Sequence, residues 1–353
     1  MTVEIDGSHG EGGGQILRTS LALSIITNRP LVIRNIRAGR AKSGLRRQHL
    51  TCVQAAAALC NAELRGASVG SQHLEFTPRE PTTARELAFD IGTAGSTTLV
   101  VQTILVPAIV ARRSLRFTVE GGTHNPMAPP FDFLERVFAP HLRAMGARVE
   151  LTLERHGFAT GAPAGKRDFY DQEVNERGKL AIAIEPQQTE HLAHLDLTTA
   201  GPVTSRHAAA LIAKLPTHVA ARELEVVRER LGFAPSECEV RELECGPANL
   251  LMLEIERGGL RELVTVHGAK GLRAETVAAR ACDELEAFLA ADVPVGEHLA
   301  DQLLLPMAVA GGGRFRCATP SLHATTNIAT IGHFLDVPIR IEPAGATAVI
   351  SIG

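Results

Sequence analysis

The chain has 353 residues, of which 45% are hydrophobic and 21% are charged, and its formal net charge at pH 7 is -3. This length and apolar content allow a large buried core and predict a globular protein of two domains. The small negative charge argues against a protein that coats nucleic acid by bulk electrostatics, and the absence of Trp, with a single Tyr, argues against an aromatic stacking platform. Any nucleic acid should therefore be gripped locally.

The sequence also bears on cellular location and on cysteine chemistry. Its longest apolar stretch, residues 99–110, is too short to span a bilayer and contains Gln102, and the charged start lacks the apolar core of a signal peptide. We expect a cytoplasmic protein with no membrane partner. The six cysteines form no C-x-x-C pair, which argues against a zinc site or a thioredoxin-like centre and predicts small buried core residues.

The first predicted elements are a short strand that contains Val3 and Ile5 and a helix that a glycine run, residues 10–14, opens. A glycine run at the start of a helix leaves backbone N–H groups free to hold an anion such as phosphate. The run does not match G-x-G-x-x-G or the P-loop motif. Glu11 within it would repel phosphate unless a divalent metal lay between them. The alternative is a glycine-rich turn with a solvated glutamate.

A basic segment lies at residues 34–47. So many like charges in one loop repel one another unless an anion lies among them, and arginine side chains suit phosphate oxygens. The alternative is a solvated basic face. The basic residues are Arg34, Arg37, Arg40, Lys42, Arg46 and Arg47.

Three glutamines mark an internal repeat. Gln15, Gln102 and Gln302 each precede an apolar helical run and follow a glycine-containing segment. Further helical spacing at residues 50–60 and 133–142, with strand-like residues 148–153 and 337–341, predicts a unit of strand, helix, strand, helix and further strands.

An insertion is predicted in the third unit, because Gln102 and Gln302 are more than twice as far apart as Gln15 and Gln102. The polar stretch 161–185 and the glycine-containing residues 267–271 would bound it. Inside it, the pattern predicts helix over residues 207–231, with a break at Pro216, and strands joined by turns over residues 240–266.

The C-terminal segment 321–327 holds His323 among small hydroxyl residues, after strand-like residues 314–317. One of 14 histidines in such a setting is more often a hydrogen-bonded structural group than a nucleophile. No H-E-x-x-H or paired-carboxylate signature occurs. Residues 166–169 lack the glycine of Lys-x-Asp-Gly, so a nucleotidyl-transfer nucleophile here would not be lysine.

Six segments carry a resemblance that none of them carries alone: residues 10–18, 36–40, 45–50, 121–126, 218–224 and 321–327. Taken together and in this order, they closely resemble the RNA 3′-terminal phosphate cyclases. The resemblance runs from about Ile5 to about Val349. It implies an α+β fold of α/β layers, with three β-α-β-α-β-β units in a large domain (1–184 and 272–353) and a smaller α/β domain (185–271) inserted in the third unit.

The resemblance also implies a reaction and its residues. ATP would convert an RNA 3′-terminal phosphate into a 2′,3′-cyclic phosphate, with release of AMP and pyrophosphate, after His323 takes up AMP as a phosphoramidate. Glu11 would bind a divalent ion, Mg or Mn. The residues bordering the nucleotide would be Gln102, His298, Leu299, Ala300, Asp301 and Gln302. The residues steadying phosphates would be Arg18, Arg37, Arg40, Gln48 and His49.

Two departures from the family pattern and two alternative functions go with this prediction. A polar insertion follows His156-Gly157-Phe158, over residues 159–185, and His298 stands where many members carry Tyr, which bears on nucleotide preference. One alternative is a cyclase-like RNA-processing protein of ribosome assembly that transfers no nucleotide, and the other is an enolpyruvyl transferase. The sequence leaves open the physiological RNA, the use of DNA 3′-phosphate ends and whether the chain forms a homodimer.

Overall fold

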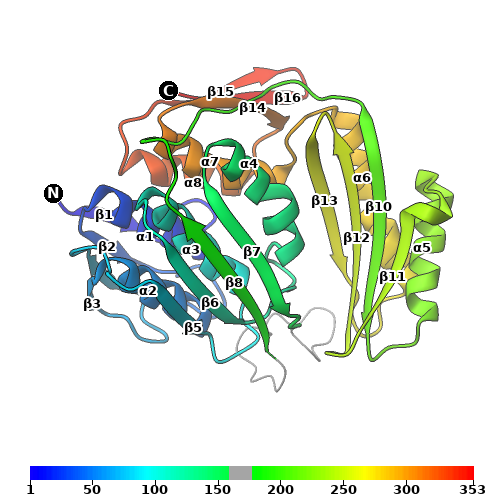
Figure 1. Ribbon diagram of the computed structural model, residues 1–353, viewed down its shortest axis with the longest axis horizontal. Coiled ribbons are helices and arrows are strands. Elements are labelled where there is room, and N and C mark those ends of the chain that lie inside the picture. The colour runs from blue at the N-terminus through cyan, green and yellow to red at the C-terminus, as the bar shows by residue number, and fades with distance from the viewer. Residues whose placement is uncertain (159–176) are drawn as a thin grey trace.

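The computed structural model describes residues 1–158 and 177–353, and Figure 1 shows their arrangement. Three four-stranded sheets share one topology. In each, the first two strands are parallel, the fourth pairs antiparallel with the second, and the third lies at the edge beyond the fourth. The predicted repeat is therefore confirmed, and so is the α+β fold class.

The first unit forms the sheet β1-β2-β4-β3. Val3 and Ile5 point into the core, and the helix that the glycine run opens is present, as expected. Its elements are β1 (Val3–Asp6), α1 (Gly14–Thr27), β2 (Leu31–Arg34), α2 (Arg47–Cys60), β3 (Glu63–Arg65) and β4 (Leu74–Thr77).

The second unit forms the sheet β5-β6-β8-β7. The helix expected over residues 133–142 begins as a π-helical turn and continues as α-helix. Part of the expected polar boundary, residues 178–185, is a strand of this sheet, and residues 159–176 lie outside the described part of the chain. The elements are β5 (Glu86–Asp90), α3 (Thr97–Val110), β6 (Leu115–Gly121), η1 (Phe133–Phe138), α4 (Ala139–Ala144), β7 (Arg148–Arg155) and β8 (Gly178–Glu185).

The third unit forms the sheet β15-β16-β14-β9, and the chain leaves it after β9 and returns at its first helix. In Figure 1 this sheet lies across the top of the view. Its elements are β9 (Asp196–Leu197), α7 (Glu297–Ala310), β14 (Gly313–Ala318), α8 (Leu322–Gly332), β15 (Ile339–Ala344) and β16 (Thr347–Ile352).

The inserted segment forms a fourth sheet, β11-β10-β12-β13, with two helices packed on one face (Figure 1). Strands joined by turns were expected over residues 240–266, and they are present. Its elements are β10 (Val203–Ala213), α5 (His218–Leu231), the short 3-10 helix η3 (Pro235–Glu237), β11 (Cys238–Leu243), β12 (Ala248–Arg257), β13 (Leu260–His267) and α6 (Ala274–Ala291).

The prediction of helix from residue 207 was wrong for residues 207–213. This alanine-rich run favours helix by intrinsic propensity, but it forms the inner strand β10, paired with β11 on one side and β12 on the other. Both faces of the strand are buried, so the helix-or-strand choice was set by tertiary packing. The break at Pro216 was correct, since α5 begins at His218.

Two apolar cores explain why β10 is buried on both faces. Ala209 and Leu211 belong to the large core that the three repeated units share, whereas Ala208, Ala210 and Ile212 belong to a second core under α5 and α6. The alternation follows the two-residue period of a strand. The inserted sheet is thus sandwiched between its own helices and the repeated units.

The remaining general features concern helices and cysteines. Within residues 1–158 and 177–353, no helix has both the length and the apolar character needed to cross a membrane. All six cysteines are free thiols, and four of them are buried, as expected for small core residues.

Candidate active site

The candidate site lies where five helices of the repeated units meet. α1 packs against α2, α3 and α8, and α7 packs against α8. α1 starts directly after the glycine run, its N-cap Gly13 offers no side-chain cap, and its first turn holds no acidic residue. Its first backbone N–H groups are therefore available to an anion.

His323 is the second residue of α8, whose N-cap Ser321 accepts a hydrogen bond of 3.2 Å from the Ala324 N–H. The ring is solvent-exposed, and its Nδ1 lies 2.9 Å from Oε1 of Gln15, the second residue of α1. The structure thus places His323 beside the glycine run and open to solvent, as a reactive group requires. It does not pack into the core.

Asp301 on α7 is the charged group behind His323. Its carboxylate accepts hydrogen bonds from three side-chain amides: Gln15, Asn327 at 3.1 Å and Gln302 at 3.2 Å. Burial raises the pKa of Asp301, while nearby His323, the amides of Asn327 and Gln15, and Arg18 act in the opposite direction. A carboxylate that accepts several N–H groups is stabilised in its charged form.

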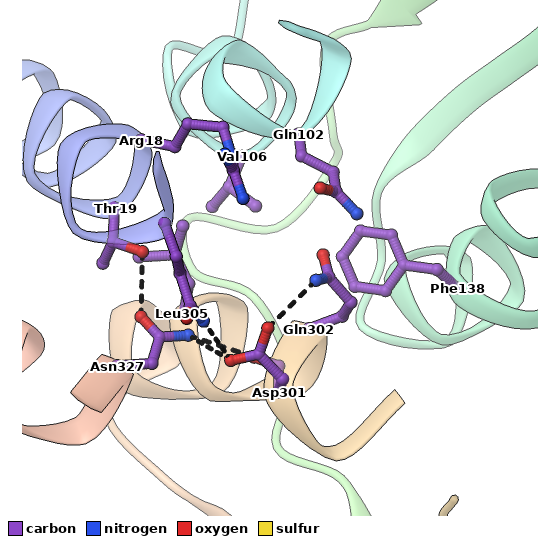
Figure 2. Close-up of a pocket in the computed structure, with 10 residues that line it drawn as sticks. Arg18, Thr19, Gln102, Val106, Phe138, Asp301, Gln302, Leu305 and Asn327 are labelled. Atoms are coloured by element: carbon purple, nitrogen blue, oxygen red, sulfur yellow. Dashed lines mark hydrogen bonds between the residues drawn. The ribbon is translucent and has the colours of Figure 1, made fainter. Parts of the chain in front are cut away.

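The three repeat glutamines line one pocket, and Figure 2 shows two of them, Gln102 and Gln302. Gln15 comes from α1, Gln102 from α3 and Gln302 from α7. Gln102 Nε2 is buried and has no hydrogen-bond partner among the described residues, so it offers a donor to a ligand. The lining residues are Gln15, Arg18, Thr19, Gln102, Val106, Phe138, Asp301, Gln302, Leu305 and Asn327.

The start of α2 supplies a neutral imidazole donor. His49 is buried, and its Nδ1 accepts the Arg46 N–H at 3.2 Å. Burial, together with nearby Arg37, Arg18 and Arg46, holds the pKa of His49 well below its usual range. The ring is therefore neutral, and its proton sits on Nε2. That nitrogen faces Gly14, because a Cβ built on Gly14 would lie 2.5 Å from it.

Gln48, the neighbour of His49, ties two units together. Its Oε1 accepts the Ser96 N–H at 2.7 Å, just before α3. This leaves the amide nitrogen of Gln48 as the end that can donate to a ligand.

The arginines differ in what they contact. Arg40 forms an ion pair with the Glu11 carboxylate, whose side chain is 14% exposed. Arg37 donates to the carbonyl oxygens of Lys42 at 2.8 Å and Gly44 at 3.0 Å, so it braces the basic loop. Arg18 lines the pocket, and burial lowers the pKa of its guanidinium.

Glu11 is the only predicted metal ligand. No group of three or more His, Cys, Asp or Glu side chains within residues 1–158 and 177–353 could hold a metal ion. One carboxylate beside an anion-binding loop fits a divalent ion that phosphate oxygens also coordinate, which is how Mg²⁺ commonly binds with a nucleotide. It does not fit a resident metal held by protein alone.

Of the six residues predicted to border the nucleotide, three do not line the pocket. His298 is exposed near the start of α7, and Leu299 and Ala300 are buried in the large core. Conversely, Asn327, Thr19 and Phe138 line the pocket although they were not predicted. Gln15 was also missing from the predicted site. Its signal was present in the sequence, because it is the first-unit counterpart of Gln102 and Gln302.

Comparison with known proteins identifies the family of the chain. Residues 9–341 match the family model described as RNA 3'-terminal phosphate cyclase. A protein of that name from Koribacter versatilis is 45% identical over 342 residues, which cover 96% of this chain and 92% of the relative. Another from Ectopseudomonas mendocina is 46% identical over 339 residues, covering 96% and 94%, and one from Salmonella agona is 44% identical over 342 residues, covering 97% and 94%. The chain belongs to the RNA 3′-terminal phosphate cyclase family.

Proposed function

We propose that this protein uses ATP to convert an RNA 3′-terminal phosphate into a 2′,3′-cyclic phosphodiester through a covalent histidine-AMP intermediate. One observation carries the proposal: an exposed His323 lies next to the uncapped start of α1, hydrogen-bonded to Gln15. A nucleophile at an anion-binding helix start is the arrangement that attack on a phosphate requires.

Activation by ATP has a physical reason. A terminal phosphate monoester is a poor electrophile, because attack by the neighbouring 2′-hydroxyl would have to expel an oxide-like group from a charged centre. His323 first attacks the α-phosphorus of ATP and releases pyrophosphate. AMP then passes to the RNA 3′-phosphate. The 2′-hydroxyl finally attacks that phosphorus, closes the ring and displaces AMP, which is a far better leaving group.

Negative charge grows on the leaving pyrophosphate and then on the leaving AMP, so donors and cations should dominate catalysis. The first N–H groups of α1, the His49 Nε2–H and the Arg18 guanidinium supply them. Arg40 and Arg37 stand on the adjoining loop. Asp301, Gln302 and the Gln102 Nε2, which has no partner among residues 1–158 and 177–353, would border the nucleotide.

A divalent ion, Mg²⁺ or Mn²⁺, would bind Glu11 together with phosphate oxygens. Bound there, it would neutralise phosphate charge and so favour departure of the leaving group. Arg40 now pairs with that carboxylate, and it would turn to phosphate when the ion takes Glu11.

The test is covalent labelling followed by product analysis. With α-labelled ATP and Mg²⁺, the wild-type protein should gain acid-labile, base-stable label, and His323→Ala should gain none. His333→Ala is the matched control, since His333 is an exposed histidine just past the far end of the same helix. Labelling of His323→Ala at the wild-type level would refute the nucleophile.

Mass analysis checks for the second outcome, formation of the cyclic phosphate. An oligonucleotide with a 3′-phosphate should lose one water when incubated with protein and ATP. The same oligonucleotide with a 2′-deoxy terminal residue should not, because it has no hydroxyl to close the ring. A non-catalytic RNA-processing protein would give neither label nor cyclic product.

A further inference from the structure

A line of hydrogen bonds joins a buried carboxylate to the exposed imidazole through a single side-chain amide. Gln15, which is 7% exposed, donates from Nε2 to Asp301 Oδ1, and its Oε1 lies 2.9 Å from His323 Nδ1. Both ends of the amide are therefore used. The three residues come from α1, α7 and α8.

The direction of each bond follows from what each group can do. Both oxygens of Asp301 accept amide N–H groups, Oδ1 from Asn327 and Oδ2 from Gln302, so Asp301 acts as an acceptor and Gln15 turns its NH₂ toward it. The Asn327 amide shares this constraint, because its oxygen accepts from the Thr19 hydroxyl at 2.8 Å and its nitrogen donates to Asp301. The Gln15 carbonyl then faces His323. Since a carbonyl also only accepts, Nδ1 of His323 must carry the proton.

We propose that Gln15 is a positioning residue that fixes His323 in its Nδ1–H tautomer and so makes Nε2 the attacking atom. This inference rests on the proposed function of His323. A neutral imidazole has one lone pair in its ring plane, and the Gln15 carbonyl leaves it on Nε2, the nitrogen that Gln15 does not contact.

The electron balance shows what the arrangement achieves. The Nε2 lone pair forms a bond to the α-phosphorus, the bond to the bridging oxygen breaks, and pyrophosphate leaves with that electron pair. Nδ1 keeps its proton, so the ring becomes positive and faces the Gln15 carbonyl, with Asp301 behind it. When AMP moves to the RNA phosphate, the N–P electrons return to Nε2. No proton has to enter or leave the ring in either step.

A purely structural role for Gln15 would be to hold α1 against α8. Other contacts already do this. Thr19 of α1 bonds Asn327 of α8, and the Glu11 N–H donates to the Thr326 hydroxyl at 3.1 Å. Gln15→Leu, which keeps the volume of the side chain and removes its polar end, should therefore fold and keep the two helices together.

The experiment reads the tautomer directly by ¹⁵N NMR of histidine-labelled protein, with the His323 signals identified by their loss in His323→Ala. The wild type should show a protonated Nδ1 and an unprotonated Nε2. Gln15→Leu should lose this preference, and Gln15→Glu should keep it, because a carboxyl oxygen still accepts from Nδ1. An unchanged tautomer in Gln15→Leu would overturn the proposal.

Rates give the second readout. Single-turnover adenylylation should fall about 10- to 100-fold in Gln15→Leu, as for other residues that orient a reactive imidazole, with little change in the ATP concentration for half-maximal rate. Gln54→Leu, on the exposed face of α2, is the matched control and should react normally. If wild type labels, His323→Ala does not and Gln15→Leu labels at full rate, the positioning role fails alone. If His323→Ala also labels, the proposed function fails.

Discussion

Gly14 is the position at which a small substitution tests the anion site most directly. A Cβ at this position would lie 2.5 Å from His49 Nε2 and 2.9 Å from an Arg18 guanidinium nitrogen, yet its backbone conformation suits any residue. We expect Gly14→Ala to fold with at most a modest loss of stability, because its Cβ must displace the buried His49 ring, which offsets the preference of alanine over glycine in helix of about 1 kcal/mol. Adenylylation should fall about 10-fold or more, because a displaced donor no longer meets the phosphate.

Gly332→Ala is the control for this change. Gly332 lies in the last turn of α8, where an added Cβ meets no atom within 4 Å. Thermal unfolding and labelling measured side by side should show normal activity for Gly332→Ala and reduced activity for Gly14→Ala. Normal labelling by Gly14→Ala would mean that no phosphate approaches this helix start.

Glu11 and Arg40 form the pair that tests metal use. Glu11→Gln removes the charge but keeps the shape, so we expect labelling to need a higher Mg²⁺ concentration, by about 10-fold, because a neutral amide is a weaker ligand for a hard cation. The measurement is labelling rate against Mg²⁺ concentration. Glu4→Gln, on the exposed face of β1, is the control. A Mg²⁺ dependence identical to wild type would remove Glu11 from the metal site.

Arg40→Glu addresses the basic loop. If this loop faces phosphate, reversing the charge should reduce turnover far more than it reduces the melting temperature, because Arg40 is partly exposed and contributes little to the core. Equal losses in turnover and stability, or none in either, would favour a solvated basic face. Arg65→Glu on β3, where the arginine is largely exposed, controls for charge reversal elsewhere.

Sequence reasoning found single residues where a local pattern marks them. Glu11 stands out in a glycine run, and His323 was singled out through the resemblance of its segment to one family. The partnership of His323 with Gln15 could not be read in this way, because the two residues are 308 positions apart and meet only when α1 packs on α8. Nor could sequence show that Arg37 braces its own loop.

At the scale of elements, the three units treat the start of their first helix differently. The start of α1 has no side-chain cap. Ser96 caps α3 by accepting from the Leu99 N–H at 3.3 Å. At α7 the backbone of the N-cap residue Gly296 donates a hydrogen bond to the carboxyl group of Glu262, which comes from β13 of the inserted sheet. A Cβ added to Gly296 would clash with this carboxyl group. Of these three helix starts, the one that follows the glycine run is thus left for a ligand.

Glu262 makes stability depend on pH. Burial, and to a smaller extent the nearby Glu284, raises the pKa of Glu262 to about 8 from a usual 4.5. Between these pH values the unfolded chain releases the proton and the folded chain keeps it. The free energy of unfolding should therefore fall as pH rises through this window, by up to about 1.4 kcal/mol per pH unit. Glu262→Gln should remove this contribution.

Urea unfolding measures the free energy of unfolding at about pH 6 and at about pH 8. The drop between these two pH values should be on the order of 2 kcal/mol smaller in Glu262→Gln than in wild type. Glu225→Gln, an exposed change on α5, should keep the wild-type slope. Buried Glu223, whose pKa burial raises to about 7, contributes a similar slope at lower pH in all three proteins. Equal slopes in wild type and Glu262→Gln would show that Glu262 is ionised in the folded state.

Helices and strands could be predicted where the spacing of apolar residues was clear. They could not be predicted where tertiary packing decided between helix and strand. The glycine run, α2 and β14 followed their patterns. β10 did not, since an alanine-rich strand buried on both faces carries no alternation to distinguish it from helix. The π-helical turn of η1 likewise leaves no mark in the spacing of Phe133, Leu134 and Val137.

At the scale of the whole molecule, the repeat contributes to the site because it brings equivalent positions of the three units together. Gln15, Gln102 and Gln302 reach one pocket from three units, a meeting point that was not predicted from the repeat. The domain limits, 1–184 with 272–353 around 185–271, stay a prediction. They place α6 outside the inserted part, although α6 packs against α5, β12 and β13.

Whatever the limits, the shared sheet predicts that the two cores unfold together. On β12, Met252 faces the large core and Leu253 faces the core under α5 and α6. Neither core can lose β12 without exposing the other. Truncating either residue to Ala should cost about 2–5 kcal/mol and shift one common transition. Calorimetry with hydrogen exchange is the measurement, since the chain has no Trp and one Tyr. Two separate transitions, with Leu253→Ala moving one alone, would show that the inserted sheet folds independently of the repeated units.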